Sequence, residues 1–123
     1  MEVLLVDDML AIRALLRVYL MGFKFTFVEA KNGAEALIAA RNRPPGLIIT
    51  DVQMPVMDGI EMLESVRADP TLAHIPVIVL SSADERENPR VKQLDPARTS
   101  FALKPINPAA LQDAVRKALR LGD

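Results

Sequence analysis

The sequence predicts an α/β fold in which helices cover both faces of a parallel β-sheet. Five short apolar runs are nearly continuous rather than alternating, which is typical of strands that are buried on both faces. Helical patterns separate these runs, so strand and helix alternate five times along the chain. This alternation, with right-handed crossovers, favours a doubly wound parallel sheet. The runs are residues 3–6, 25–28, 47–50, 77–80 and 101–103.

Four of the intervening segments predict regular helices. Residues 12–20 and 111–119 each carry apolar side chains at i, i+3, i+4, i+7 and i+8 spacing, which places these side chains on one helix face. Residues 34–41 are rich in alanine and leucine, which are strong helix formers, and they follow the turn dipeptide Asn32-Gly33. Residues 60–67 predict a helix that ends before Asp69-Pro70.

Residues 83–100 are the exception, because their apolar content is low and they contain two prolines. Asn88 can cap a short helix whose first position is Pro89. Pro96 would then end this helix after about two turns. We therefore expect only a short helix between the fourth and fifth strands.

The composition favours one small globular domain and excludes several classes of protein. The chain has 123 residues, of which 50% are hydrophobic and 25% charged, and it contains no cysteine. This length supports one core, so we expect a single domain over residues 1–123. The net charge of −1 argues against direct nucleic-acid binding and against a polybasic membrane-binding surface. The apolar runs are too short to cross a bilayer and no signal-peptide pattern is present, so we expect a cytoplasmic protein.

Polar side chains follow four of the predicted strands, at the point where each strand ends. Asp7 and Asp8 follow the first run, Asp51 follows the third, Ser81 the fourth and Lys104 the fifth. In an open parallel sheet, ligands bind outside the carboxyl ends of the strands, where the strand order reverses. Neighbouring strands are only about 4.8 Å apart, so these side chains can share one small site.

The three predicted neighbours Asp7, Asp8 and Asp51 require a compensating cation. At an effective dielectric constant of about 20, two carboxylates about 5 Å apart repel each other by about 3 kcal/mol. Carboxylates without nearby histidine or cysteine suit a hard, oxygen-seeking ion, and Mg²⁺ is the ion that these ligands favour. Mg²⁺ also shares phosphate oxygens readily, so the cluster predicts one half of a phosphoryl-transfer site.

Lys104 and Ser81 supply the other half of such a site. The ammonium group of Lys104 offers a compact positive charge to phosphate oxygens, and the hydroxyl of Ser81 offers a donor. Asp51 is the best candidate for a nucleophile that forms an aspartyl-phosphate, because it stands alone at the end of its strand. Taken singly, each residue would more often be a turn, cap or surface residue. Their joint placement after successive strands favours the site.

These residues belong to motifs that resemble the receiver domain of bacterial two-component response regulators. The motifs are Asp7-Asp8, residues 51–59 (DVQMPVMDG), residues 76–81 (PVIVLS) and Lys104-Pro105. Phe101, three residues before the lysine, matches the aromatic switch position of that family. The resemblance covers essentially the whole chain, and it is closest in kind to stand-alone, chemotaxis-type regulators.

The resemblance implies a flavodoxin-like (βα)5 fold with the strand order 2-1-3-4-5. It implies that Asp51 is the phosphoacceptor and that Lys104 and Ser81 hold the phosphoryl oxygens. Asp7 and Asp8 would bind Mg²⁺ together with Asp51 and the backbone carbonyl of Gln53. Ser81 and Phe101 would form the switch that moves on phosphorylation. The Lys104–Pro105 bond is similar to one that is usually cis in this family.

The function implied by the resemblance is that of a stand-alone response regulator with no output domain. A histidine kinase or a histidine phosphotransfer protein would supply the phosphoryl group, and a downstream protein would bind the phosphorylated form. The chain would not be an enzyme that acts on other substrates, because it would catalyse only its own phosphorylation and dephosphorylation. One alternative is a phosphorelay intermediate. Another, a Mg²⁺-dependent phosphatase with an aspartate nucleophile, is disfavoured because Gln53 stands where a second acid is needed.

The region between the fourth and fifth strands departs from the family pattern. Receivers usually have a regular fourth helix followed by a Gly-Ala turn. Here Pro89 precedes a short segment, and residues 95–100 (DPARTS) replace the turn. We therefore expect a short or irregular fourth helix and an altered output surface. We also expect His74, the only histidine, to lie on the surface away from the acids.

Overall fold

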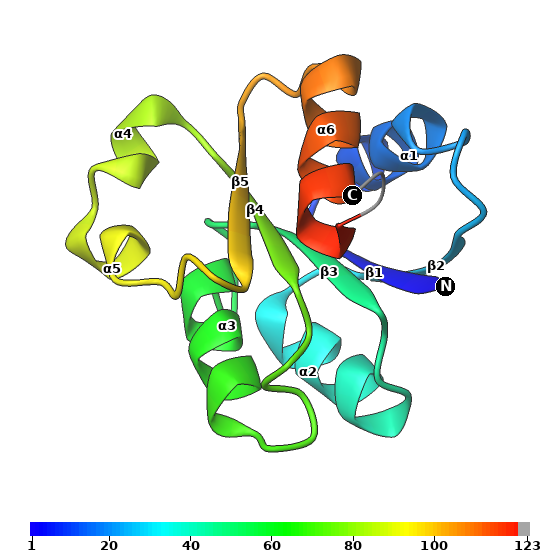
Figure 1. Ribbon diagram of the computed structural model, residues 1–123. Helices are drawn as coiled ribbons and strands as arrows, with labels where there is room; N and C mark the ends of the chain where they lie inside the picture. Colours follow the sequence, from blue (N-terminus) through cyan, green and yellow to red (C-terminus); the bar gives the residue numbers. More distant parts are fainter. Residues whose placement is uncertain (121–123) are drawn as a thin grey trace.

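The computed structural model describes residues 1–120 of the chain, in which five parallel strands form one sheet. The strand order is β2-β1-β3-β4-β5, as the family resemblance implied (Figure 1). β1 and β3 lie inside the sheet next to each other, which is where the strand order reverses. The strands are β1 (Glu2–Val6), β2 (Thr26–Ala30), β3 (Leu47–Asp51), β4 (Val77–Ser81) and β5 (Thr99–Leu103).

Helices pack on both faces of the sheet and enclose two apolar cores. On one face, α1 and α6 cover a core that includes Leu16, Leu111 and Val115. On the other face, α2 and α3 cover a core that includes Leu37 and Leu63. Figure 1 shows these two layers on either side of the strands. The helices are α1 (Leu10–Tyr19), α2 (Gly33–Asn42), α3 (Gly59–Ala68), α4 (Ala83–Arg86), α5 (Pro89–Lys92) and α6 (Pro108–Leu119).

The three inner strands and four long helices lie where the sequence predicts them, but two edge strands are longer than predicted. β2 runs to Ala30 and includes Glu29, which pairs in register with Leu5 of β1. Arg13 pairs with the Glu29 carboxylate at 2.8 Å, so the strand accommodates a charged residue beyond the predicted run of residues 25–28. β5 begins at Thr99, which pairs with Val77 of β4. Apolar content alone misses such polar strand residues.

The segment between β4 and β5 forms two single-turn helices, which confirms the expectation of an irregular fourth helix. The side chain of Asn88 caps α5 by accepting a hydrogen bond from the Arg90 backbone at 2.9 Å, and Pro89 occupies the first position. The prediction of about two turns was wrong, because α5 ends at Lys92 after four residues. α4 was not predicted. A capping box between Ser82 and Glu85 starts it.

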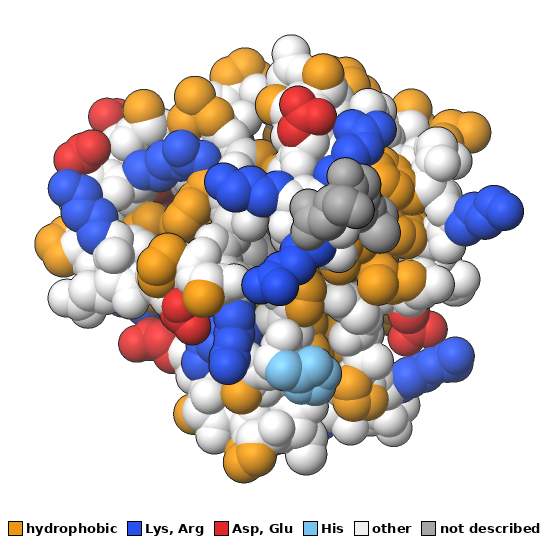
Figure 2. Space-filling view, in the orientation of Figure 1, with side chains coloured by type: hydrophobic (Ala, Val, Ile, Leu, Met, Phe, Trp, Pro, Cys, Tyr) orange, Lys and Arg blue, Asp and Glu red, His pale blue; other side chains and the backbone are white. Residues whose placement is uncertain are grey.

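The surface of the described residues agrees with the mixed composition of the chain. Basic side chains lie among acidic and apolar ones on the face shown in Figure 2. His74 is exposed, as predicted. Among residues 1–120, no helix is both long enough and apolar enough to span a membrane. Residues 121–123 of the predicted domain lie outside the described residues.

Candidate functional site

The predicted acidic cluster forms at the carboxyl ends of β1 and β3. Asp7, Asp8 and Asp51 each place a carboxylate oxygen within 4.8 Å of the others. Asp7 and Asp51 are buried, whereas Asp8 is exposed. The adjacency of β1 and β3 in the sheet therefore brings together side chains that are more than forty residues apart in sequence.

Backbone amides hold the two buried carboxylates in place. The Met9 amide donates to Oδ1 of Asp7 at 2.9 Å, and the Val52 amide donates to Oδ1 of Asp51 at 2.8 Å. Burial raises the pKa of Asp7, and the negative charges of Asp51 and Asp8 raise it further, while the Met9 hydrogen bond lowers it. Burial and nearby like charge therefore make the ionised form of Asp7 costly without a cation.

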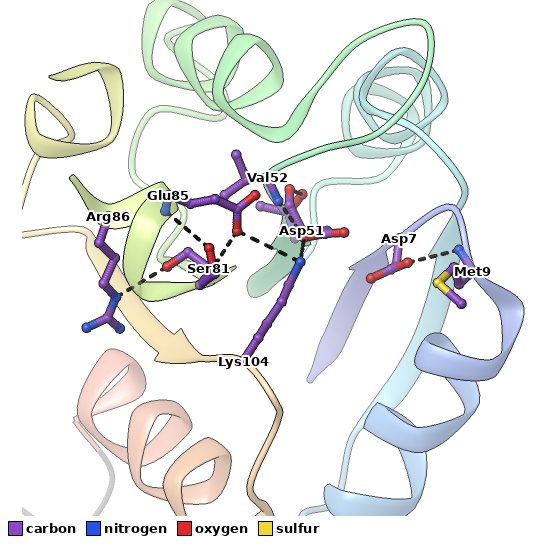
Figure 3. Close-up of polar contacts among 10 residues, drawn as sticks. Asp7, Met9, Asp51, Val52, Ser81, Glu85, Arg86 and Lys104 are labelled. Atoms are coloured by element: carbon purple, nitrogen blue, oxygen red, sulfur yellow. Dashed lines mark hydrogen bonds and ion pairs between the residues drawn. The ribbon is translucent and has the colours of Figure 1, made fainter. Parts of the chain in front are cut away.

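Lys104 reaches this cluster from the end of β5. Its Nζ forms an ion pair with Oδ1 of Asp51 and lies 4.0 Å from Oε1 of Glu85 (Figure 3). The Lys104 amide donates to the Ser81 carbonyl at 3.0 Å, which ties the lysine to the end of β4. The following peptide bond, Lys104–Pro105, is cis, as expected.

The carboxylates and the ammonium group fit a divalent cation. When the three acids are ionised, they and Lys104 carry a formal charge of −2. All the nearby ligand atoms in the cluster are carboxylate oxygens, which are the ligands that Mg²⁺ prefers. Asp7, Asp8 and Asp51 could hold the ion. Gln53 lies in the exposed loop after β3, two residues beyond Asp51, and its carbonyl stays a predicted ligand.

Ser81 lies at the predicted edge of the sheet, but its hydroxyl does not face the acids. The side chain is fully buried, and its Oγ accepts a hydrogen bond from Nε of Arg86 at 3.2 Å. Figure 3 shows the Ser81 side chain turned toward Arg86, on the side away from Asp51. Phe101 lies on β5, half-buried, and the Arg86 guanidinium carbon is 5.1 Å from the centre of its ring.

Sequence reasoning missed two charged side chains at this site, Glu85 and Arg86 of α4. Glu85 had a detectable signal, because Ser82 and Glu85 have the serine–glutamate spacing of a capping box. Arg86 had none. Its contacts join α4 to β4 and β5, and contacts between segments leave no periodic pattern in the sequence.

A close approach at the N-terminus of α3 fixes the backbone of Asp51. A Cβ atom built on Gly59 would lie 2.0 Å from the Asp51 carbonyl oxygen, so only glycine fits. The Gly59 amide also donates to the Val52 carbonyl at 2.8 Å. The glycine that ends the motif of residues 51–59 thus lets α3 start directly against the strand end.

Comparison with known proteins gives a consistent family assignment. Residues 3–116 match the family model of the response regulator receiver domain. The KDP operon transcriptional regulatory protein KdpE of Escherichia coli is 38% identical over 119 residues, which are 97% of this chain and 51% of KdpE. The probable transcriptional regulator ycf27 of Porphyra purpurea is 32% identical over 99% of this chain and 49% of its own length. This chain therefore spans about half the length of these curated relatives.

A solved structure of similar fold covers nearly the whole chain. The chemotaxis response regulator CheY4 of Vibrio cholerae superimposes with a TM-score of 0.84 at 30% sequence identity. The superposition covers 95% of this chain and 97% of that chain. The strand order and the helix layers are therefore features of a shared fold.

Proposed function

This chain belongs to the receiver domains of response regulators, and from that premise we propose that Asp51 accepts a phosphoryl group from a phosphohistidine donor. Receiver domains are signalling modules rather than classical enzymes, they bind Mg²⁺ in their active site, and they interact with histidine kinases and downstream targets. One observation carries the proposal. The carboxylate of Asp51 is buried, is paired with Lys104, and lies within 4.8 Å of two further carboxylates.

The hydrogen bonds of Asp51 favour one of its oxygens as the nucleophile. Within residues 1–120, both hydrogen bonds to this carboxylate, from the Val52 amide and from Lys104, go to Oδ1. Oδ2 is then the oxygen that attacks phosphorus. A P–O bond forms at Oδ2, the P–N bond of the phosphohistidine breaks, and its electron pair returns to the imidazole nitrogen. The nucleophile is a carboxylate oxygen, so the transfer needs no general base.

The remaining groups position the incoming phosphoryl group and balance its charge. Lys104 is close enough to Asp51 to follow the new phosphoryl oxygens, which are stronger acceptors than the carboxylate. Bound Mg²⁺ would neutralise charge that develops on those oxygens, with Asp7, Asp8, Asp51 and the Gln53 carbonyl as its protein ligands. Catalysis would then depend on position and charge rather than on acid–base chemistry.

An apolar groove beside the acids is suited to the phosphodonor protein. Ile12, Leu15 and Tyr19 of α1 line it together with Pro105 and Ile106. Asp7, Asp51 and Lys104 line the same groove. A donor helix that packs its apolar face here would bring its phosphohistidine to Asp51. A histidine kinase or a histidine phosphotransfer protein has the required chemistry.

The proposal is tested by labelling the protein with acetyl phosphate and separating the phosphorylated form on a phosphate-affinity gel. We expect Mg²⁺-dependent labelling of the wild type, none in Asp51→Asn, and none after chelation. Asp113→Asn is the matched control, because Asp113 is an exposed acid on α6 that is far from the cluster in sequence and 78% exposed. Equal labelling of Asp51→Asn and wild type would refute the nucleophile assignment. Labelling that persists in chelator would refute the metal assignment.

Two further parts of the proposal concern the cellular role of the chain. We propose that it acts in the cytoplasm and signals by binding a partner protein once it is phosphorylated. An immunoblot of cell fractions should find it in the cytoplasmic fraction. A signal confined to another fraction would contradict this. Transfer of the phosphoryl group onward to a second histidine protein would instead identify a phosphorelay intermediate.

A further inference from the structure

Arg86 contacts both residues that the family resemblance assigns to the switch, Ser81 and Phe101. Its Nε donates to Oγ of Ser81 at 3.2 Å, and its guanidinium carbon lies 5.1 Å from the centre of the Phe101 ring. Ser81 ends β4, Phe101 lies on β5, and Arg86 ends α4. One side chain therefore joins three elements next to the acidic cluster.

The Arg86–Ser81 hydrogen bond is stabilising because the Ser81 hydroxyl is buried. Ser81 has no exposed surface, and a buried hydroxyl that loses its partner is costly, whereas an exposed one can bond to water. The donor is charged, and such hydrogen bonds are stronger than those between neutral groups. The bond therefore stabilises the orientation in which the Ser81 hydroxyl points away from Asp51 (Figure 3).

The start of α4 brings Arg86 within reach of Ser81. Ser82 and Glu85 form reciprocal capping bonds of 2.8 Å and 3.1 Å, which fold the chain into a helical turn directly after β4. The same turn places Oε1 of Glu85 4.0 Å from Nζ of Lys104. Both predicted phosphoryl-binding groups, the hydroxyl of Ser81 and the ammonium of Lys104, thus have a charged side chain of α4 beside them.

We propose that Arg86 is a positioning residue that holds Ser81 and Phe101 in their unphosphorylated arrangement. This inference rests on the proposed function. For Ser81 to donate a hydrogen bond to a phosphoryl oxygen on Asp51, its hydroxyl must turn away from Arg86 and give up the hydrogen bond that it accepts there. The guanidinium then loses the hydrogen bond that helps to hold it over the Phe101 ring. The ring is then free to move together with the Ser81 hydroxyl. Phosphorylation therefore requires the Arg86–Ser81 hydrogen bond to break, and a variant that lacks this bond should favour the phosphorylated arrangement.

Beryllofluoride, a phosphoryl mimic, measures the effect through its affinity for the protein in the presence of Mg²⁺. Arg86→Met keeps an apolar chain over Phe101 but cannot donate to Ser81. We expect it to bind beryllofluoride roughly three- to tenfold more tightly than wild type by calorimetry. Arg86→Lys, which keeps a cation and a donor, should restore affinity toward that of wild type. Unchanged or weaker binding by Arg86→Met would overturn the inference.

Arg90→Met is the matched control, because Arg90 lies four residues further on and forms surface ion pairs with Asp58 and Glu64. It removes the same charge and should change the affinity by less than about twofold. The NMR signals of the Phe101 ring give a second readout. In Arg86→Met without ligand they should shift toward their positions in beryllofluoride-bound wild type. No shift in that direction would contradict a role in holding the ring.

A double-mutant cycle isolates the hydrogen bond itself. In a Ser81→Ala background, Arg86→Met should no longer tighten beryllofluoride binding, because the bond is already absent. Tightening that persists in this background would refute the mechanism. Arg86 is only partly buried, so the variants should stay folded, which circular dichroism checks. If wild type fails to bind beryllofluoride, or if Asp51→Asn binds it equally well, the proposed function fails. If only the Arg86 effects are absent, this inference alone fails.

Discussion

Replacing Gly59 with alanine should distort the end of the strand that carries Asp51. The added Cβ would lie 2.0 Å from the Asp51 carbonyl oxygen, whereas ordinary contact begins at 3.4 Å. Backbone atoms therefore have to separate by about 1.4 Å, because neither partner is a flexible side chain. β3 is hydrogen-bonded to β1 and β4 on both sides, so the strain falls on the strand end and on the start of α3.

The cost of this overlap can be estimated from other overpacked sites. Forcing extra atoms into a packed site typically costs about 1–3 kcal/mol. Alanine returns up to about 1 kcal/mol through its better helix propensity. We expect a net loss of about 1–2 kcal/mol in the free energy of unfolding. For a domain of this size, the loss corresponds to a melting temperature lower by roughly 4–8 °C.

The displacement of Asp51 should also slow its phosphorylation, apart from any effect on stability. A displacement of about 1 Å in a reacting group can cost roughly a hundredfold in rate. At a temperature where the variant is fully folded, Gly59→Ala should label with acetyl phosphate at least about tenfold more slowly than wild type. Urea unfolding and a labelling time course measure the two effects separately.

Gly22 supplies a matched control for this substitution. A Cβ built on Gly22 meets nothing within 4 Å, so Gly22→Ala should leave labelling unchanged. Its stability should be unchanged or higher by up to about 1 kcal/mol, because alanine restricts the unfolded chain. The reasoning is refuted if Gly59→Ala is as stable and as quickly labelled as Gly22→Ala.

Three further predictions concern the metal, one ion pair and one structural arginine. Mg²⁺ at ten times its dissociation constant should stabilise the wild type by about 1.4 kcal/mol, and Asp8→Asn should lose this gain in a thermal melt at the same concentration. The Arg13 hydrogen bond, more than any other effect, lowers the pKa of Glu29 in the folded state. The stability that Glu29 contributes is therefore present above its unfolded pKa and lost as the pH falls through its folded pKa. The difference in urea midpoint between wild type and Glu29→Gln should shrink on acidification, and a constant difference would contradict this. Arg67 donates hydrogen bonds of 2.7–3.1 Å to three backbone carbonyls, so Arg67→Ala should lower the free energy of unfolding by about 2–3 kcal/mol in urea. A loss below about 0.5 kcal/mol would show that these bonds do not matter.

The parts of the fold that follow from burial were predictable from sequence. β1, β3 and β4 are buried along nearly their whole length, so each appears as an unbroken apolar run. The convergence of Asp7, Asp8 and Asp51 was also predictable, because the carboxyl ends of neighbouring parallel strands share one edge. The edge strand β2 was less predictable. The charge of its Glu29 is neutralised by arginines on α1, and a pattern of apolar residues gives no sign of such an ion pair.

The orientation of Ser81 was beyond the reach of sequence reasoning. Its place at the end of β4 follows from the strand pattern, but the direction of its hydroxyl depends on the side-chain rotamer. In the structure that hydroxyl accepts a hydrogen bond from Arg86, which lies in the short helix that the capping box starts. A serine–glutamate pair three residues apart was visible in the sequence, so α4 itself could have been predicted.

The most direct test of the central claim is to identify the residue that becomes phosphorylated. Reduction of an acyl phosphate with borohydride converts the modified aspartate to homoserine, and peptide mass spectrometry locates it. After treatment with acetyl phosphate and Mg²⁺, we predict homoserine at position 51 and at no other acidic residue. Homoserine at Asp7, at Asp8 or elsewhere, with Asp51 unmodified, would contradict the account.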